Sequence, residues 1–181
     1  MVSLIHIKTK RHGDHRGFFA ETYSRFKYSG LGIDVEFVQD NHSLSREVGT
    51  LRGLHFQAPP HAQAKLVRCG RGAIFDVAVD IRRGSPTYGQ WEGYELSCEN
   101  GDQLYVPVGF AHGFVTLDPD SEIVYKCSDY YAPEKEGAVL WNDLDIGIKW
   151  PIEADPILSV KDAAAPLLKE LESPFVFGEN S

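Results

Sequence analysis

The chain has 181 residues, of which 43% are hydrophobic and 24% charged, values that are ordinary for a globular protein and that exclude a disordered or fibrous chain. Its formal net charge of −8 disfavours a broad surface for nucleic acid or anionic membrane, because phosphate groups are bound by clustered Lys and Arg. No stretch reaches the ~18 apolar residues of a membrane span and the N-terminal segment lacks the apolar core of a secretion signal, so we expect a cytoplasmic protein that contacts neither membrane nor nucleic acid.

Short alternating segments, separated by glycine and proline, run from Val35 to Tyr130 and are typical of a sheet-rich domain. The clearest strand is predicted for residues 73–81, where the apolar side chains of one face alternate with Asp76 and Asp80. The segment ENGDQ, residues 99–103, is the strongest hairpin signal. Many short antiparallel strands predict an all-β fold, either a jelly roll or a small β-barrel.

A helix is predicted only near the C-terminus, in KDAAAPLLKEL, residues 161–171. Asp162 could cap its alanine-rich turn, and Pro166 limits its regularity. No linker or internal repeat divides the chain, so residues 1–181 are predicted to form a single domain. The tail SPFVFGENS, residues 173–181, could dock on the body of the domain or on a partner.

The three cysteines, Cys69, Cys98 and Cys127, lie far apart and form no CxxC pair. We expect all three to be buried small hydrophobic residues in a reducing compartment.

Several polar side chains interrupt the predicted strands. A buried charge or imidazole is unfavourable unless it is paired or used, so these positions are candidates for chemistry. They are Arg52 and His55 in LRGLHFQ, Lys65, Arg68, His112, Tyr125 and Lys126.

A metal site is not predicted. A strand-borne metal pair would place a second histidine two residues after His55, and that position is Gln57. His61 and Gln63 follow two prolines, which favour a loop over a ligand held in a strand. The chain lacks a G-x-S-x-G elbow and any signature around its cysteines, which disfavours serine or cysteine hydrolysis. It also lacks a dinucleotide or phosphate-binding glycine motif, so no cofactor is expected.

Acid and base chemistry by histidine, tyrosine and lysine remains. An imidazole with a carboxylate on its second nitrogen suits the removal of a proton next to a ketone, and a lysine or second histidine would stabilise the enolate oxygen. The residues alone leave two interpretations of His55 open, a structural histidine and a base.

Nine segments in order resemble one family. They are DHRGFFAETY, FVQDNHS, LRGLHFQ, QAKLVRC, FDVAVDIRRGSPTYGQW, VPVGFAHGF, YKCSDYYAPEKEG, WNDLDIGIKWP and SVKDAAAPLL. Together they closely resemble the dTDP-4-dehydrorhamnose 3,5-epimerase family, from about Ile5 to Leu168.

The resemblance implies a double-stranded β-helix, the cupin type of jelly roll, which is metal-free and assembles as a homodimer with its site shared across the interface. It implies that dTDP-4-dehydro-6-deoxy-D-glucose is epimerised at C3 and C5 to dTDP-4-dehydro-L-rhamnose, a step towards dTDP-L-rhamnose and surface polysaccharides. Two alternatives stay open: a related enzyme that inverts one centre or isomerises the keto group, and a non-catalytic binding module for sugar nucleotides.

The resemblance also assigns residues. It makes His55 the proton acceptor, Asp162 its partner, Tyr125 the acid, and Lys65 the group near the C4 oxygen. The other matched positions are substrate-binding: His112 for the sugar, and Arg16, Glu21, Gln39, Asn41, Arg52, Glu136 and Lys161 for the nucleotide. Phe19 and Tyr131 could stack on the substrate.

Some of these assignments have a structural alternative. Arg16 could be a solvated turn residue, Glu136 a loop charge and Asp162 only a helix cap, while Phe19 and Tyr131 could pack in the core.

Strict alternation also places Arg52 and His55 on opposite faces of a strand, although the family needs both at the site. We expect a bulge at Gly53 to turn one of them.

Overall fold

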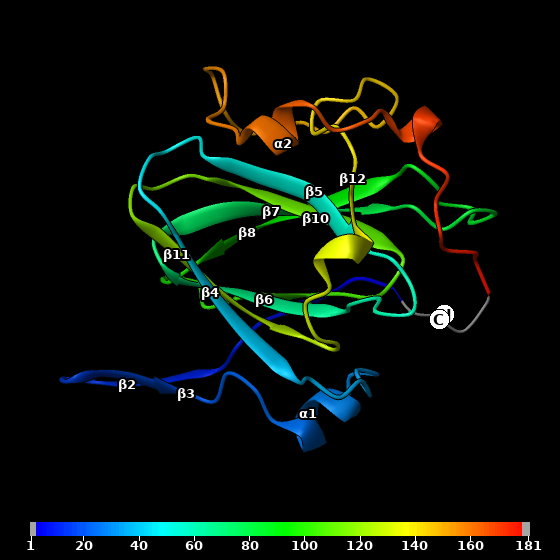
Figure 1. Ribbon diagram of the computed structural model, residues 1–181. Coiled ribbons are helices and arrows are strands. Elements are labelled where there is room, and N and C mark those ends of the chain that lie inside the picture. Colours follow the sequence, from blue (N-terminus) through cyan, green and yellow to red (C-terminus); the bar gives the residue numbers. More distant parts are fainter. Residues whose placement is uncertain (1–2, 179–181) are drawn as a thin grey trace.

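Two five-stranded antiparallel sheets face each other in the computed structural model, which describes residues 3–178 (Figure 1). The first sheet has the order β1 (Ile5–Ile7), β9 (Gln103–Val106), β6 (Lys65–Arg71), β11 (Ser121–Cys127) and β4 (Gln39–Ser45). The second has the order β12 (Glu136–Ala138), β5 (Leu51–Gln57), β10 (Phe110–Thr116), β7 (Ala73–Asp80) and β8 (Trp91–Ser97). Most neighbouring strands are distant in sequence and the chain crosses repeatedly between the sheets, so the predicted all-β jelly roll of cupin type is confirmed.

The remaining elements lie outside the two sheets. They are the hairpin of β2 (Arg11–Asp14) and β3 (Gly17–Ala20), the helices α1 (Arg25–Ser29) and α2 (Val160–Ala163), and the 3-10 turns η1 (Pro133–Lys135) and η2 (Leu168–Glu170). The hairpin projects away from the sheets, at the lower left of Figure 1. The predicted C-terminal helix is confirmed as a short segment, which Pro166 divides into α2 and η2. Its cap is Ser159 rather than Asp162, whose backbone N–H donates to the Ser159 hydroxyl.

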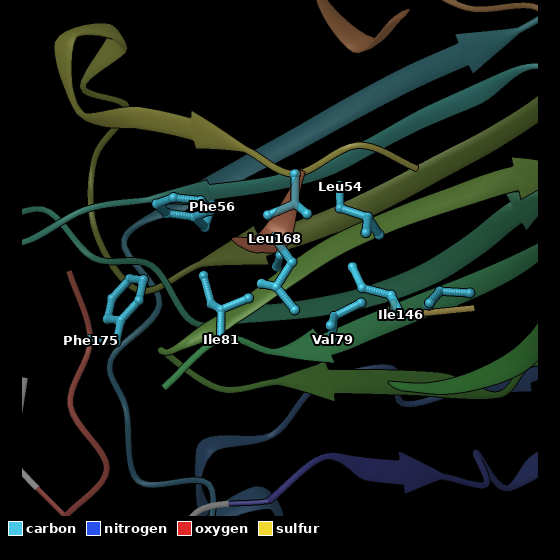
Figure 2. Close-up of a cluster of buried hydrophobic side chains, with 10 residues drawn as sticks. Leu54, Phe56, Val79, Ile81, Ile146, Leu168 and Phe175 are labelled. Atoms are coloured by element: carbon cyan, nitrogen blue, oxygen red, sulfur yellow. The ribbon is translucent and has the colours of Figure 1, made fainter. Parts of the chain in front are cut away.

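The outer face of the second sheet is covered by the C-terminal part of the chain. Apolar side chains of β5 and β7 pack there against residues from the last 45 positions, as Figure 2 shows for Leu54, Phe56, Val79, Ile81, Ile146, Leu168 and Phe175. Phe175 belongs to the tail, so the tail docks on the body as far as it is described. Burial of this face accounts for the apolar alternation that predicted β7.

A second apolar cluster fills part of the space between the sheets and includes Val67, Ile74 and Leu104. The aspartates of β7 point into this space, and Asp76 is 0% exposed. The predicted polar face of this strand is therefore an interior face. A third cluster, with Tyr28 and Leu66, joins α1 to the outer face of the first sheet.

Two sequence predictions are wrong. ENGDQ does not close a hairpin, because β8 pairs with β7 while β9 pairs with β1 and β6 in the other sheet. The turn is present, with Gly101 at φ +69°, but it carries the chain from one sheet to the other. Cys98 is exposed in that turn, whereas Cys69 and Cys127 are buried as expected.

Within the described residues, no helix is long and apolar enough to span a membrane. The single-domain interpretation of residues 1–181 stays a prediction, and residues 1–2 and 179–181 lie outside the described part.

Candidate active site

His55 of β5 makes a hydrogen bond with the buried Asp162 of α2, with 2.5 Å between Nε2 and Oδ1. The bond from the backbone N–H of Asp162 to Ser159 Oγ, 3.0 Å long, fixes the turn that carries the carboxylate. A carboxylate only accepts, so Nε2 of His55 carries the proton and Nδ1 is left with its lone pair. Burial lowers the pKa of His55, and the bond to Asp162 only partly opposes this. The imidazole is therefore mostly neutral at pH 7, the form that a base requires.

A bulge in β5 places Arg52 on the same side as His55. His55 pairs with His112 of β10 and Arg52 pairs with Phe114, so β5 has one residue more than its partner over this stretch. Gly53 lies in the bulge at φ +127°, where an added Cβ would be 2.5 Å from the Cα of Gly113. The bulge expected at Gly53 is thus confirmed, and it corrects the strict alternation that separates the two side chains.

Lys65 and Tyr125 come from the opposite sheet. Lys65 of β6 pairs with Cys127 of β11. Cys127 is two residues after Tyr125 on the same strand, so the side chains of Lys65, Cys127 and Tyr125 share the face towards the second sheet. The positive charge of Lys65 contributes to the lowered pKa of His55 on the second sheet.

Burial shifts the pKa values of both Lys65 and Tyr125. Burial lowers the pKa of the Lys65 ammonium, against the nearby charges of Cys127, Asp76 and Glu136. Burial raises the pKa of the Tyr125 phenol, against a hydrogen bond from Asn41 and the positive charge of Arg52. Tyr125 is therefore protonated at neutral pH and can act as an acid.

His112 has its own buried carboxylate, which sequence reasoning missed. Its Nε2 is 2.8 Å from Oδ1 of Asp76, and the other carboxylate oxygen, Oδ2, has no hydrogen-bond partner within the described part of the chain. Asp76 could have been found from the sequence, because it is a carboxylate inside an apolar strand, the same criterion that selected His55.

Glu136, Lys161 and Tyr131 form a cluster next to His55. The Lys161 ammonium contacts the carboxylate of Glu136, and the Tyr131 hydroxyl also bonds to it. Burial alone would raise the pKa of Glu136, but these two bonds outweigh it and lower the pKa. The Tyr131 ring is 56% exposed, so it does not pack in the core.

Gln39 and Asn41 lie on β4, at the edge of the first sheet. Gln39 Nε2 donates to Asn41 Oδ1 at 3.0 Å, and Asn41 Nδ2 lies 3.6 Å from the Cys127 sulfur. In register, Asn41 pairs with Tyr125 and Gln39 with Cys127, so both amides border the same group of side chains.

Three predicted residues are not brought to this group. Arg16, Phe19 and Glu21 lie on or next to the β2–β3 hairpin, which projects away from the sheets (Figure 1). Arg16 pairs with Asp14, while Glu21 pairs with Lys27. Phe19 is 70% exposed, so the alternative that it packs in the core is wrong, as it is for Tyr131.

Among residues 3–178, no three His, Cys, Asp or Glu side chains cluster in a way that could hold a metal ion. The absence of a metal and of a cofactor stays a prediction.

The arrangement suits proton transfer at carbon. A neutral imidazole on one sheet faces a protonated phenol on the other, with an ammonium group between the sheets to stabilise a developing oxyanion. Removal of a proton on one face of a carbon atom and its return on the opposite face would invert that carbon.

Comparisons with known proteins show what the chain is similar to. A sequence model of the dTDP-4-dehydrorhamnose 3,5-epimerase family matches residues 1–170. The dTDP-4-dehydrorhamnose 3,5-epimerase of Salmonella typhimurium is 57% identical over 91% of this chain and 90% of its own length. A crystal structure of the dTDP-6-deoxy-D-glucose-3,5-epimerase of Legionella pneumophila with dTDP-4-keto-L-rhamnose has a TM-score of 0.90 and 49% identity, covering 93% of this chain and 89% of that one. The crystal structure of a 3'-monoepimerase of Streptomyces bikiniensis in complex with dTDP-quinovose has a TM-score of 0.86 and 39% identity. The match covers 92% of this chain and 84% of that one.

Proposed function

Since the chain belongs to the dTDP-4-dehydrorhamnose 3,5-epimerase family, we propose that His55, Asp162, Lys65 and Tyr125 carry out the family's reaction here. That reaction converts dTDP-4-dehydro-6-deoxy-D-glucose into dTDP-4-dehydro-L-rhamnose by inversion at C3 and C5. The chain is therefore an isomerase of dTDP-L-rhamnose biosynthesis. The observation that carries the residue assignment is the pair of His55, on one sheet, with Asp162 of α2, opposite Tyr125 on the other sheet.

The C4 ketone makes the protons on C3 and C5 removable. Nδ1 of His55 accepts one of them, and the electron pair of the C–H bond moves to form an enolate at C4. Lys65 donates a hydrogen bond to the enolate oxygen and Asp162 stabilises the imidazolium formed at His55, while His112 contacts the sugar. The Tyr125 hydroxyl then protonates the same carbon from the opposite face, which inverts it. Solvent returns a proton to the tyrosine and takes one from the histidine, and the second carbon follows the same course.

The dTDP group is bound by the surrounding charged and aromatic residues. Arg52 and Lys161 neutralise the diphosphate, Gln39 and Asn41 border it, and the exposed Tyr131 ring stacks on the nucleotide. Glu136 keeps Lys161 and Tyr131 in place through its two bonds.

Arg16, Phe19 and Glu21 act in the site of a second copy of the chain. Their hairpin leaves its own sheets and exposes an aromatic ring, which supports a homodimer in which each site is completed by the partner's hairpin. Two of the three free cysteines are buried, which is compatible with the proposed cytoplasmic location.

The test is conversion of dTDP-4-dehydro-6-deoxy-D-glucose in deuterated water. We expect solvent deuterium at both C3 and C5, and none at either carbon with His55→Ala. Deuterium at C3 alone would make the chain a single-centre epimerase, like the Streptomyces neighbour. Tight dTDP binding without any exchange in the unaltered protein would instead make it a binding module.

A further inference from the structure

Gln57 is a buried amide at the end of β5 that the reaction does not use. Its side chain is 5% exposed and bonds only to main-chain groups among the described residues. Nε2 donates to the carbonyl of Tyr130 at 2.9 Å and to the carbonyl of His61, and Oε1 accepts from the N–H of Ala132 at 2.9 Å. Two of these three bonds fall on the residues immediately before and after Tyr131.

A second amide holds Tyr131 from the other sheet. The backbone N–H of Tyr131 donates to Oε1 of Gln39 at 3.0 Å. Gln39 belongs to β4 of the first sheet and Gln57 to β5 of the second, so the segment around Tyr131 is tied across the opening between the two sheets.

This arrangement fixes the backbone of Tyr131 and leaves its side chain exposed. Residues 128–132 have no regular structure that would hold them, and the Tyr131 ring is 56% exposed. Glu136 raises the pKa of the Tyr131 phenol, so the hydroxyl lies near that carboxylate. A buried amide is unfavourable unless its bonds are made, and here two of the three are made to the loop of Tyr131 and the third to the carbonyl of His61. An exposed ring on a rigid backbone binds a flat partner with little loss of conformational entropy.

We propose that Gln57 is a positioning residue for nucleotide binding, which acts by fixing the Tyr131 ring in the orientation that stacks on the substrate. The proposal rests on the proposed function, in which Tyr131 contacts the nucleotide. It predicts that Gln57 affects the binding of dTDP and of substrate, and does not affect proton transfer at the sugar.

The test is a double-mutant cycle between Gln57→Met and Tyr131→Ala. Methionine has nearly the volume of glutamine but makes none of its hydrogen bonds, so packing is kept while the loop is released. With Gln57→Met alone, KM and the dTDP dissociation constant should each rise about tenfold, with kcat changed less than about twofold. In a protein that already carries Tyr131→Ala, the same substitution should change neither by more than about twofold, because the ring it positions is absent.

Gln63→Met is the matched control. Gln63 also donates to the main chain of this segment, at the Asp129 carbonyl over 2.8 Å, but does not flank Tyr131. The Gln63→Met substitution should leave KM and the affinity for dTDP unchanged. If Gln57→Met gives too little folded protein, Gln57→Glu keeps the acceptor for the Ala132 N–H and is measured in the same cycle.

Equal effects of Gln57→Met with and without the Tyr131 ring would overturn the proposal, as would a fall in kcat with KM unchanged. No effect of Tyr131→Ala on dTDP affinity would also overturn it. Failure of the proposed function is seen separately, as absence of turnover in the unaltered protein, while the dTDP measurements still decide the role of Gln57.

Discussion

His55 and Asp162 are 107 positions apart in the sequence, yet Nε2 of one and Oδ1 of the other are 2.5 Å apart. The short α2 turn, capped by the Ser159 side chain, carries the carboxylate to β5. Because the carboxylate is buried, its charge acts on the imidazole with little screening.

Asp162→Asn should lower kcat about 100-fold or more, because an asparagine neither stabilises the imidazolium nor holds a single tautomer. Asp162 raises the pKa of His55 against the larger effect of burial, so its loss lowers that pKa further. The low-pH limb of kcat/KM against pH should therefore move to lower pH. Asp143→Asn is the control, since Asp143 is also a buried aspartate of the C-terminal part, but among the described residues its carboxylate bonds only to the N–H groups of Asp145 and Leu168. A limb that stays in place with Asp162→Asn would contradict the pairing.

Much of this site could be predicted from the sequence, for reasons that differ between residues. The alternation in residues 73–81 reports burial of one strand face, and it led correctly to β7. The glycine at position 53 signalled the bulge, because a residue with φ near +127° and a backbone 2.5 Å from its missing Cβ must be glycine.

Other parts depend on contacts that no local pattern contains. The pairing of His55 with Asp162 was expected only from the family resemblance. The alternation predicts a polar face for Asp76, since alternation does not show that both faces of a strand are buried. The sequence marks Gln57 only as the residue that stands where a second metal-binding histidine would be, because its three hydrogen-bond partners lie on two loops.

Tyr125→Phe should separate proton removal from inversion. The phenyl ring keeps the packing of Tyr125 but cannot donate a proton, so an enolate formed by His55 is protonated again from the side of the base. We expect solvent deuterium to enter the substrate with its configuration retained, and the yield of inverted product to fall about 100-fold. Nuclear magnetic resonance of the recovered sugar nucleotide measures both. Full inversion by Tyr125→Phe would assign the acid to another group.

The pH profile of the unaltered enzyme should be bell-shaped. The low-pH limb reports protonation of His55, whose pKa burial places below its ordinary value, and the high-pH limb reports loss of the Lys65 proton, whose pKa burial also lowers. Lys65→Arg keeps a positive charge at all accessible pH, so the high-pH limb should move up towards the raised pKa of Tyr125. Lys126→Arg is the control, because Lys126 pairs with Asp40 on the outer side of the same sheet. An unchanged high-pH limb with Lys65→Arg would exclude Lys65 as its source.

Gly53→Ala should destabilise the fold by about 3 kcal/mol, because the new Cβ meets the backbone of Gly113 and φ is positive. Gly32→Ala is a matched control with φ +84° and no atom within 4 Å of the added Cβ, so it should lose only about 1 kcal/mol. Urea unfolding of both variants isolates the contribution of the close approach. Equal losses would mean that the bulge tolerates a side chain.

Mixing inactive variants tests whether two chains share a site. Arg16→Ala removes the guanidinium of the hairpin and His55→Ala removes the base, so each homodimer should be nearly inactive. If the hairpin serves the partner's site, a mixed dimer has one site with both residues intact. Random reassociation makes half the dimers mixed, so activity should recover to about a quarter of that of the unaltered enzyme. His55→Ala mixed with Asp162→Asn is the control and should recover nothing, because both residues serve the same site of the same chain. No recovery in the first mixture, with subunit exchange shown by mass spectrometry, would place Arg16 outside the partner's site.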